Sequence, residues 1–152
     1  MKALIFSDSH QNVGAMQRII EKEKDISYII HAGDVFSDVE ELMMLYPRKN
    51  FIYVIGNNDL FVKDEPTERF FELFGVKIYL THGHKENVKY GIYKLYMTAR
   101  EKGADLVIFG HTHRKFIEEE EGICLFNPGC ASSSYGILEI NKGKFSLSHI
   151  NM

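Results

Sequence analysis

Five short polar clusters rich in aspartate, histidine and asparagine carry the clearest chemical signal in this chain, and each follows an apolar run. They are Asp8-Ser9-His10, Gly33-Asp34, Gly56-Asn57-Asn58-Asp59, His82-Gly83-His84 and Gly110-His111-Thr112-His113. Carboxylate and amide oxygens, together with imidazole nitrogens, suit a pair of divalent transition metals. Because each cluster would stand at the end of a strand, side chains far apart in the sequence could converge on one rim of a sheet.

The spacing inside the clusters also suits metal binding. Asp8 and His10 are two residues apart, as are His111 and His113, and residues i and i+2 of extended backbone face the same side. Asp34 follows a glycine, which lets the backbone turn or approach the site closely, and its two carboxylate oxygens could bridge two cations. Each imidazole must be neutral to bind, so metal occupancy should fall as the pH drops.

The composition is that of an ordinary globular protein. The chain has 152 residues, of which 45% are hydrophobic and 26% are charged, and its formal net charge is -3. This length predicts a single domain over residues 1–152. The charge argues against an extended nucleic-acid surface, but it does not exclude a nucleotide, because bound metals would add positive charge.

The sequence gives no sign of a membrane or secretory protein. No apolar stretch approaches the length of a membrane span, and the apolar stretch at the N-terminus is too short for a signal peptide. Cys124 and Cys130 form no disulfide framework and are interpreted as reduced thiols. We therefore expect a cytoplasmic protein, and the sequence leaves its oligomeric state open.

The elements that must position the clusters alternate between strands and helices. Apolar runs predict strands at residues 3–7, 28–31, 51–55, 76–80 and 106–109. Helices are expected after Gln11, from a capping box at 37–40, from Pro66 up to Gly75, and from an N-cap at Asn87 up to Gly103. Four short strands with turn signals follow, at residues 116–117, 123–126, 135–140 and 144–149, with Glu118–Glu121 at a solvated hairpin tip. This order predicts an α/β (α+β) fold of mixed sheets covered by helices.

The order of the five clusters resembles the calcineurin-like metallophosphoesterase superfamily, over about residues 2–140. The short length, the single domain and the Asn127-Pro128-Gly129 turn resemble its small bacterial and archaeal phosphodiesterase branch. That branch also includes a eukaryotic retromer subunit whose role is largely protein binding. The resemblance implies two packed mixed β-sheets flanked by helices, a four-layer αββα fold, with the site at the carboxyl ends of the strands.

The resemblance also implies two metal positions that share Asp34. The first set is Asp8, His10, Asp34 and His113, and the second is Asp34, Asn57, His82 and His111. The ions would be divalent transition metals, with manganese favoured over iron, nickel or zinc. Two cations about 3.5–4 Å apart would neutralise the phosphoryl oxygens and lower the pKa of a bridging water, whose hydroxide then attacks phosphorus. The implied activity is that of a metal-dependent phosphodiesterase acting on a small-molecule or nucleotide phosphodiester.

Asn58 is where the sequence departs from the family pattern. Active relatives commonly carry histidine or cysteine there, and the histidine is thought to protonate the leaving oxygen. An asparagine amide donates a hydrogen bond but delivers no proton. Asp59 would orient the residues that contact the metals or the substrate, without contacting them itself. His84 is either a substitute proton donor or a structural histidine. Asn58, Asp59 and His84 are therefore the candidate catalytic residues.

Substrate contacts are harder to predict than metal ligands. Asn12 could cap the first helix, contact substrate, or both, and Arg114 could meet a phosphate through its guanidinium fork. His31 is expected to be buried and hydrogen-bonded, and His149 to lie on the surface. Two alternatives to a phosphodiesterase stay open: a phosphomonoesterase, and a weakly active metal-binding scaffold for protein interaction.

Overall fold

The first strand shows how the sequence builds the layers of the molecule. In the computed structural model, which describes residues 1–152, β1 (Lys2–Phe6) is almost wholly buried. Ala3 and Ile5 join the core between two sheets, whereas Leu4 and Phe6 join a second core under helices. This alternation follows from the two-residue period of a strand, and it places a layer on each face of β1.

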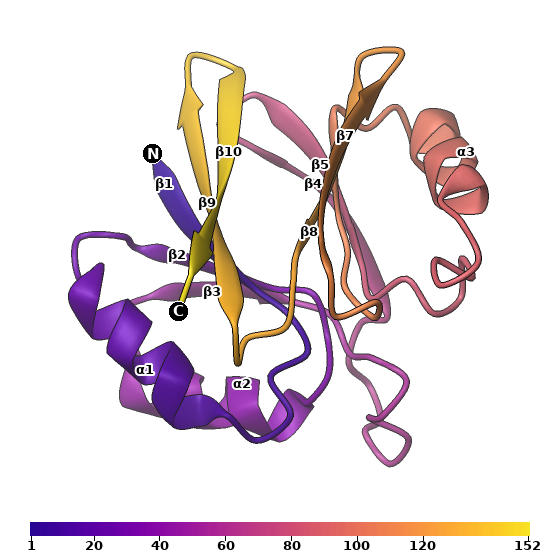
Figure 1. The fold of residues 1–152 in the computed structure, drawn as a ribbon. Coiled ribbons are helices and arrows are strands. Elements are labelled where there is room, and N and C mark those ends of the chain that lie inside the picture. The colour runs from indigo at the N-terminus through magenta and orange to yellow at the C-terminus, as the bar shows by residue number, and fades with distance from the viewer.

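The first sheet is mixed and has the order β10-β9-β1-β2-β3. Its central pairs β1–β2 and β2–β3 are parallel, and β9 and β10 pair antiparallel. The remaining strands are β2 (Tyr28–His31), β3 (Asn50–Tyr53), β9 (Ser134–Asn141) and β10 (Lys144–Asn151). Two helices, α1 (Val13–Lys22) and α2 (Phe36–Leu45), lie on its outer side (Figure 1).

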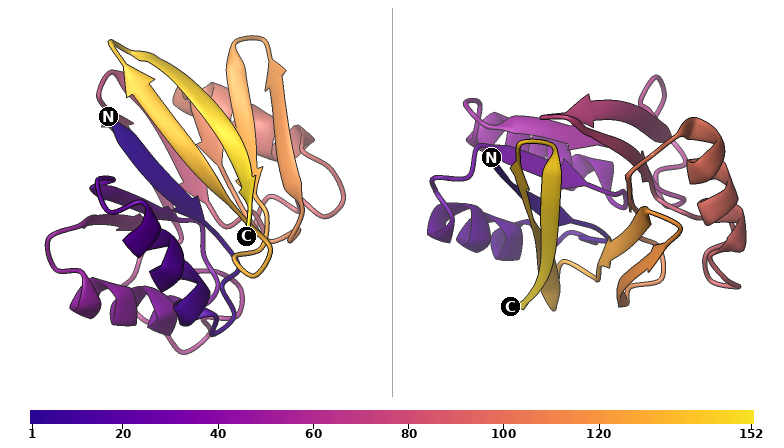
Figure 2. Two further views of the ribbon diagram at one scale, coloured as in Figure 1. Left: turned by 60° about the vertical axis from the view of Figure 1, so that its left-hand side comes forward. Right: turned by 90° about the horizontal axis from the view of Figure 1, so that it is seen from above.

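The second sheet is also mixed, with the order β4-β5-β6-β8-β7. Its strands are β4 (Glu68–Leu73), β5 (Val76–Thr81), β6 (Leu106–Ile108), β7 (Lys115–Glu120) and β8 (Ile123–Pro128). The helix α3 (Tyr93–Lys102) covers the outer face through Leu95, Tyr96 and Ala99. Figure 2 shows the sheets between the helices from two further directions. The expected αββα arrangement is confirmed, and no helix is long and apolar enough to cross a membrane.

The predicted helix between Pro66 and Gly75 is wrong. Residues 68–73 form β4, which pairs antiparallel with β5, and Phe74 and Gly75 close the hairpin with positive φ angles of 48° and 84°. Phe71 and Leu73 pack on the core between the sheets, two residues apart, whereas Phe70 is 47% exposed. The apolar residues therefore follow the period of a strand, and the sheet pairing outweighs the helix-start signal of Pro66.

Two helix starts also differ from their predictions, and one predicted capping hydrogen bond is missing. Asn87 adopts a left-handed turn (φ 55°), and α3 begins only at Tyr93, because Val88 packs within the preceding loop instead of on a helical face. The helix α2 begins at Phe36, so Ser37 and Glu40 of the predicted capping box both lie inside the helix, and Val35 is the N-cap residue. Asp38 in its first turn accepts hydrogen bonds from Ser9 and Gln11. Asn12 is the N-cap residue of α1, but its side chain makes no capping hydrogen bond.

Two further positions in the C-terminal part differ from expectation. Glu118–Glu120 lie within β7, and only Glu121 and Gly122 form the hairpin turn. His149 is half-buried instead of lying free on the surface, because its ring stacks on Phe126 with centroids 4.4 Å apart. Its Nε2 also lies 2.7 Å from the carbonyl oxygen of Asn127. Stacking and this polar contact together hold the imidazole against the second sheet.

Candidate metal centre

The five polar clusters meet where strands of both sheets end. Asp8 follows β1, Asp34 lies three residues after β2, and Asn57 lies beyond β3 in the first sheet. His82 follows β5 in the second sheet, yet its Nε2 lies 3.3 Å from Oδ2 of Asp34 and 3.8 Å from Oδ1 of Asp8. The packed sheets thus bring the predicted ligands together across the layer boundary.

Asp8 occupies the centre of this cluster and is completely buried. Its Oδ2 accepts hydrogen bonds from the Ser7 hydroxyl (2.7 Å) and from the backbone N–H of His111 (3.0 Å). Its Oδ1, in contrast, has no hydrogen-bond partner. A buried acceptor without a partner is costly, and burial raises the pKa of this carboxyl group. A cation beside Oδ1 would satisfy that oxygen.

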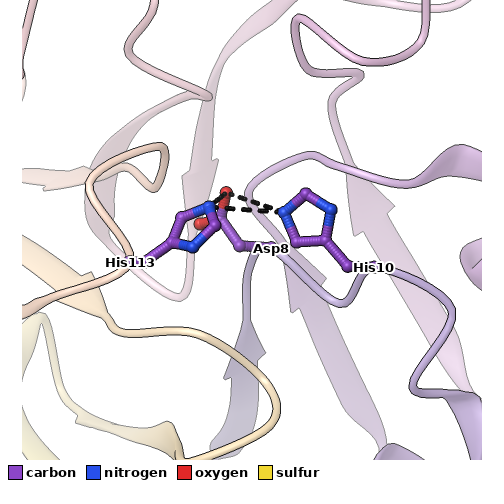
Figure 3. A group of neighbouring side chains, drawn as sticks. All are labelled: Asp8, His10 and His113. Carbon is purple, nitrogen blue, oxygen red and sulfur yellow. Dashed lines mark hydrogen bonds and ion pairs between the residues drawn. The ribbon is translucent and has the colours of Figure 1, made fainter.

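Imidazole nitrogens surround the unpartnered oxygen of Asp8. The Nε2 atoms of His113 and His10 lie 3.3 Å and 4.0 Å from Oδ1, and they are 3.3 Å from each other (Figure 3). These three residues, and separately Asp8, Asp34 and His82, place candidate ligand atoms within 4.8 Å of one another. The donor set of carboxylate oxygen and imidazole nitrogen fits a divalent transition metal in each group.

Hydrogen bonding fixes the tautomer of the neutral His82 ring in a way that suits a ligand. Its Nδ1 lies 2.8 Å from the carbonyl oxygen of Ala32, which only accepts, so Nδ1 carries the hydrogen. In the neutral ring Nε2 is then free to bind a metal. This nitrogen faces Asp8, Asp34 and the side-chain oxygen of Asn57, which is 3.0 Å away.

The ring of His111 lies next to that of His82, with centroids 5.1 Å apart at an angle of 69°. Burial, followed by the charges of His82 and Lys89, lowers the pKa of His111 to about 4. The imidazole is therefore neutral near pH 7, the form that binds metals. The structure thus brings all seven predicted ligands into one region.

The backbone at the predicted ligands is unusual. Five of them adopt left-handed φ angles, which are uncommon for residues other than glycine: Asp8 (52°), His10 (44°), Asp34 (50°), His111 (69°) and His113 (60°). Such conformations cost energy and concentrate at functional sites, where the surrounding structure holds them. The strands end in these strained turns, which aim the side chains into the shared rim.

Two glycines let the backbone pass close to the carboxylates. A Cβ atom at Gly56 would collide with Oδ1 of Asp34, and one at Gly110 would collide with the Ser7 hydroxyl and approach Oδ2 of Asp8 to 2.8 Å. The Cβ at Gly56 would also lie 2.9 Å from the backbone N of Asp34, and the one at Gly110 would lie 3.0 Å from Cβ of Ser7. The two glycines therefore provide the space in which Asp8 and Asp34 sit.

The candidate catalytic residues take three different positions. Asn58 donates to Asp34 twice, from Nδ2 to Oδ2 (2.7 Å) and from its backbone N–H to Oδ1 (3.1 Å). Burial opposes ionisation of Asp34, but His82 and these two N–H groups lower its pKa below the ordinary value. Asp59 is buried and accepts hydrogen bonds from the backbone N–H groups of Phe36 and Gly56, both at 2.8 Å, so it joins the loop after β3 to α2.

His84 lies at the edge of the cluster. Its ring centroid is 5.5 Å from that of His82 and 6.1 Å from that of His111, and its Nδ1 is buried without a partner. Burial and the charge of His82 lower its pKa. Of the candidate substrate contacts, Arg114 is exposed on a cleft beside His113, whereas Asn12 stands at the start of α1.

A network of buried polar residues behind the ligands was missed by sequence reasoning. Asp38 accepts a hydrogen bond from the Ser9 hydroxyl (2.6 Å), and His31, buried as predicted, contacts the same hydroxyl through Nε2 (3.2 Å). Asn127 donates from Nδ2 to the carbonyl oxygen of Gly110 (2.9 Å) and to Oγ1 of Thr112 (3.1 Å). Ser9 and Thr112, which each lie between two predicted ligands in the sequence, were the available signal of this network.

Two curated relatives align with nearly the whole chain. The probable metallophosphoesterase YsnB of Bacillus subtilis is 32% identical over 92% of this chain and 85% of its own length. The phosphodiesterase MJ0936 of Methanocaldococcus jannaschii is 30% identical, over 95% of this chain and 96% of its own length.

Solved structures show the same architecture. A predicted phosphoesterase from Streptococcus pneumoniae superposes with a TM-score of 0.82 at 26% identity, covering 99% of this chain and 88% of the other. Vps29 of Entamoeba histolytica, solved with zinc, shares the fold with a TM-score of 0.79 at 20% identity, covering 99% of each chain. The family profile described as "Calcineurin-like phosphoesterase superfamily domain" matches residues 1–143. The chain therefore belongs to the calcineurin-like phosphoesterase superfamily.

Proposed function

We propose that this protein is a dinuclear-metal-dependent phosphodiesterase whose two ions share Asp34. The observation that carries the proposal is the buried, unpartnered Oδ1 of Asp8, with three imidazole Nε2 atoms within 4.0 Å. Membership of the superfamily and the 30% identity to the phosphodiesterase MJ0936 support the reaction class.

The two ions would be held by two ligand sets drawn from the rim. Asp8, His10, Asp34 and His113 form one set, and Asp34, Asn57, His82 and His111 form the other. The mixed oxygen and nitrogen donors favour manganese, with iron, nickel and zinc as the other candidates. When bound, such a pair supplies positive charge at the phosphoryl oxygens and a nucleophile at neutral pH.

The residues around the ligands would orient the site. Asn58 holds both oxygens of Asp34, and the bond from Nδ1 of His82 to Ala32 keeps its Nε2 toward the carboxylates. Asp59 fixes the loop that carries Asn57 and Asn58. Residues of this kind typically change metal affinity or activity 10–100-fold when they are replaced.

Proton delivery to the leaving group would fall to His84 or to solvent, because the Asn58 amide has no proton to give at neutral pH. The position of the His84 ring, 5.5 Å from that of His82 and 6.1 Å from that of His111 between centroids, supports this assignment. The substrate would be a small-molecule phosphodiester in the cytoplasm. A phosphomonoesterase is the nearest alternative within the superfamily.

A phosphoester panel, assayed after removal of bound metal and readdition of single metals, tests the proposal. We expect bis(4-nitrophenyl) phosphate to be hydrolysed only with a divalent transition metal, and more efficiently than 4-nitrophenyl phosphate. The variant Asp34→Ala should be inactive, whereas the exposed control Asp25→Ala should match the wild type. Turnover without metal, or an active Asp34→Ala variant, would contradict the proposal, and binding of metals without any hydrolysis would favour the scaffold alternative.

A further inference from the structure

A cleft of about 700 Å³ opens beside the candidate metal centre, within the size range of small-molecule sites. It is lined by the chain that leads into α3, by the loop that joins β6 to β7, and by the first residues of β7. Thr112 and Arg114 line it, and these residues alternate with His111 and His113 along the chain. The cleft is therefore continuous in sequence with two predicted metal ligands.

The floor of the cleft is apolar and partly aromatic. Phe109 and Phe116 meet edge to face with ring centroids 5.9 Å apart, and Ile92 lies half-buried beside them. Phe109 is buried and fixes the position of Phe116, whose ring is partly accessible. Aromatic rings prefer edge-to-face or offset contacts with another ring, so this floor suits a flat aromatic group.

The rim of the cleft is basic. Lys89 and Arg114 are exposed, and neither side chain makes a hydrogen bond or an ion pair with the rest of the chain. Lys115, in contrast, donates to Oδ1 of Asn151 at 2.9 Å. Glu118 is the one carboxylate that lines the cleft. In a chain of net charge -3, two unpaired cations beside the predicted metals provide a place for an anion.

Lys89 lines the same cleft as Thr112 and Arg114, which flank the predicted ligand His113 in the sequence. An anion between Lys89 and Arg114 would therefore be near a phosphoryl group held by the metals, but in a separate place. The guanidinium fork of Arg114 matches the oxygens of a phosphate.

We propose that this cleft is a substrate subsite that selects nucleotide-like phosphodiesters: the aromatic base lies on Phe116 and Ile92, and a second phosphate lies between Lys89 and Arg114. This inference rests on the proposed phosphodiesterase function, because the scissile phosphodiester would sit at the metals. It identifies the substrate class as a nucleotide diester with an additional phosphate, in preference to a diester that lacks the second phosphate or the base.

Binding without chemistry tests the subsite directly. Calorimetry would compare thymidine 3′,5′-bisphosphate with thymidine 5′-monophosphate, which share the base and the 5′-phosphate. We expect the bisphosphate to bind about tenfold more tightly, the contribution of a charge-assisted contact at an exposed rim. The double variant Lys89→Gln, Arg114→Gln should reduce that ratio to about one. The exposed control pair Lys24→Gln, Arg48→Gln removes the same charge elsewhere and should preserve it.

Kinetics on the metal-loaded chain provides the second measurement. The 4-nitrophenyl ester of thymidine 5′-phosphate would be compared with the same ester carrying a 3′-phosphate, and the ratio of their kcat/KM values should fall to about one in the double variant only. Equal binding of the two nucleotides by the wild type, or an unchanged ratio in the double variant, would overturn the subsite. A chain that hydrolyses no phosphodiester with any metal would instead refute the proposed function, while the binding ratio would still report on the cleft.

Discussion

Asn58 holds Asp34 by hydrogen bonds but cannot protonate a leaving group. Substitutions at Asn58 can measure these two properties separately. Its amide and its backbone N–H both bind Asp34, but the amide supplies no proton to a leaving group. We predict that hydrolysis depends steeply on leaving-group pKa in the wild type, with nitrophenyl esters cleaved well and alkyl or nucleoside leaving groups cleaved poorly. The variant Asn58→His should speed the poor leaving groups most, by up to about 100-fold, since general acid catalysis contributes that much.

The structure also indicates how much metal affinity is lost when the Asn58 side chain is replaced. Any substitution at Asn58 keeps the backbone bond to Oδ1 of Asp34 (3.1 Å), whereas Asn58→Ala removes only the 2.7 Å side-chain bond to Oδ2. A hydrogen bond to a charged group contributes about 1.5–3 kcal/mol, and exposure of Asn58 favours the low end. Metal affinity in Asn58→Ala should therefore fall about tenfold.

The assay is a series of aryl and alkyl phosphodiesters of increasing leaving-group pKa, measured at saturating metal so that the loss of metal affinity does not contribute. The slope of log(kcat/KM) against leaving-group pKa should become shallower in Asn58→His and stay unchanged in Asn58→Ala. If His84 already donates the proton, Asn58→His will change little and His84→Ala will steepen the slope. An unchanged slope in both Asn58→His and His84→Ala would refute this account of proton delivery.

Three further predictions concern stability and metal binding. Burial, followed by the charge of His82, lowers the pKa of His31 from 6.5 to about 3, so at this residue the unfolded chain binds one more proton between these values. Urea unfolding of the metal-free protein should show stability falling below pH 6.5, with about 2 kcal/mol of the fall at pH 5 contributed by His31. The variant His31→Asn should lose that part of the pH dependence, and an unchanged pH slope in it would contradict this. Chelation should lower the Tm, and a free metal concentration of 100 times Kd should restore about 2.7 kcal/mol; a Tm indifferent to metal would disprove metal binding by the folded chain. Gly56→Ala should displace the Asp34 carboxylate and weaken metal binding at least about tenfold, measured by metal titration. Wild-type metal affinity in this variant would contradict the prediction, because it would show that the carboxylate has room to move.

The strands that pair in parallel were the most predictable part of the fold, because their apolar runs are long enough to identify each one. The strand Tyr28–His31 was predicted to the residue, and the other parallel strands to within two residues. The β4 strand was mistaken for a helix, because Pro66 is compatible with a helix start and pairing with β5 is not visible locally. The start of α2 was misplaced for a similar reason: Asp38 in its first turn bonds to Ser9, 29 residues away, and the local pattern of residues 37–40 does not show this tertiary contact.

The candidate ligands could be found from the sequence because their positions follow from topology: parallel strands end at one edge, and polar residues there converge. Their support could not be found in the same way. Tertiary packing gives Asp8 and His113 their left-handed backbone. It also places Asn127 where its amide donates hydrogen bonds to Gly110 and Thr112. Arg114 was a candidate phosphate contact, but the basic cleft could not be predicted, because Lys89 is 25 residues away in sequence and looks like an ordinary surface charge.

The sharing of Asp34 between two ions is the central claim, and anomalous diffraction from crystals grown with manganese tests it most directly. The account predicts two anomalous peaks per chain, about 3.5–4 Å apart, one beside Asp8, His10 and His113 and the other beside Asn57, His82 and His111, with Asp34 between them. A single peak, or two peaks that Asp34 does not contact, would contradict the dinuclear centre.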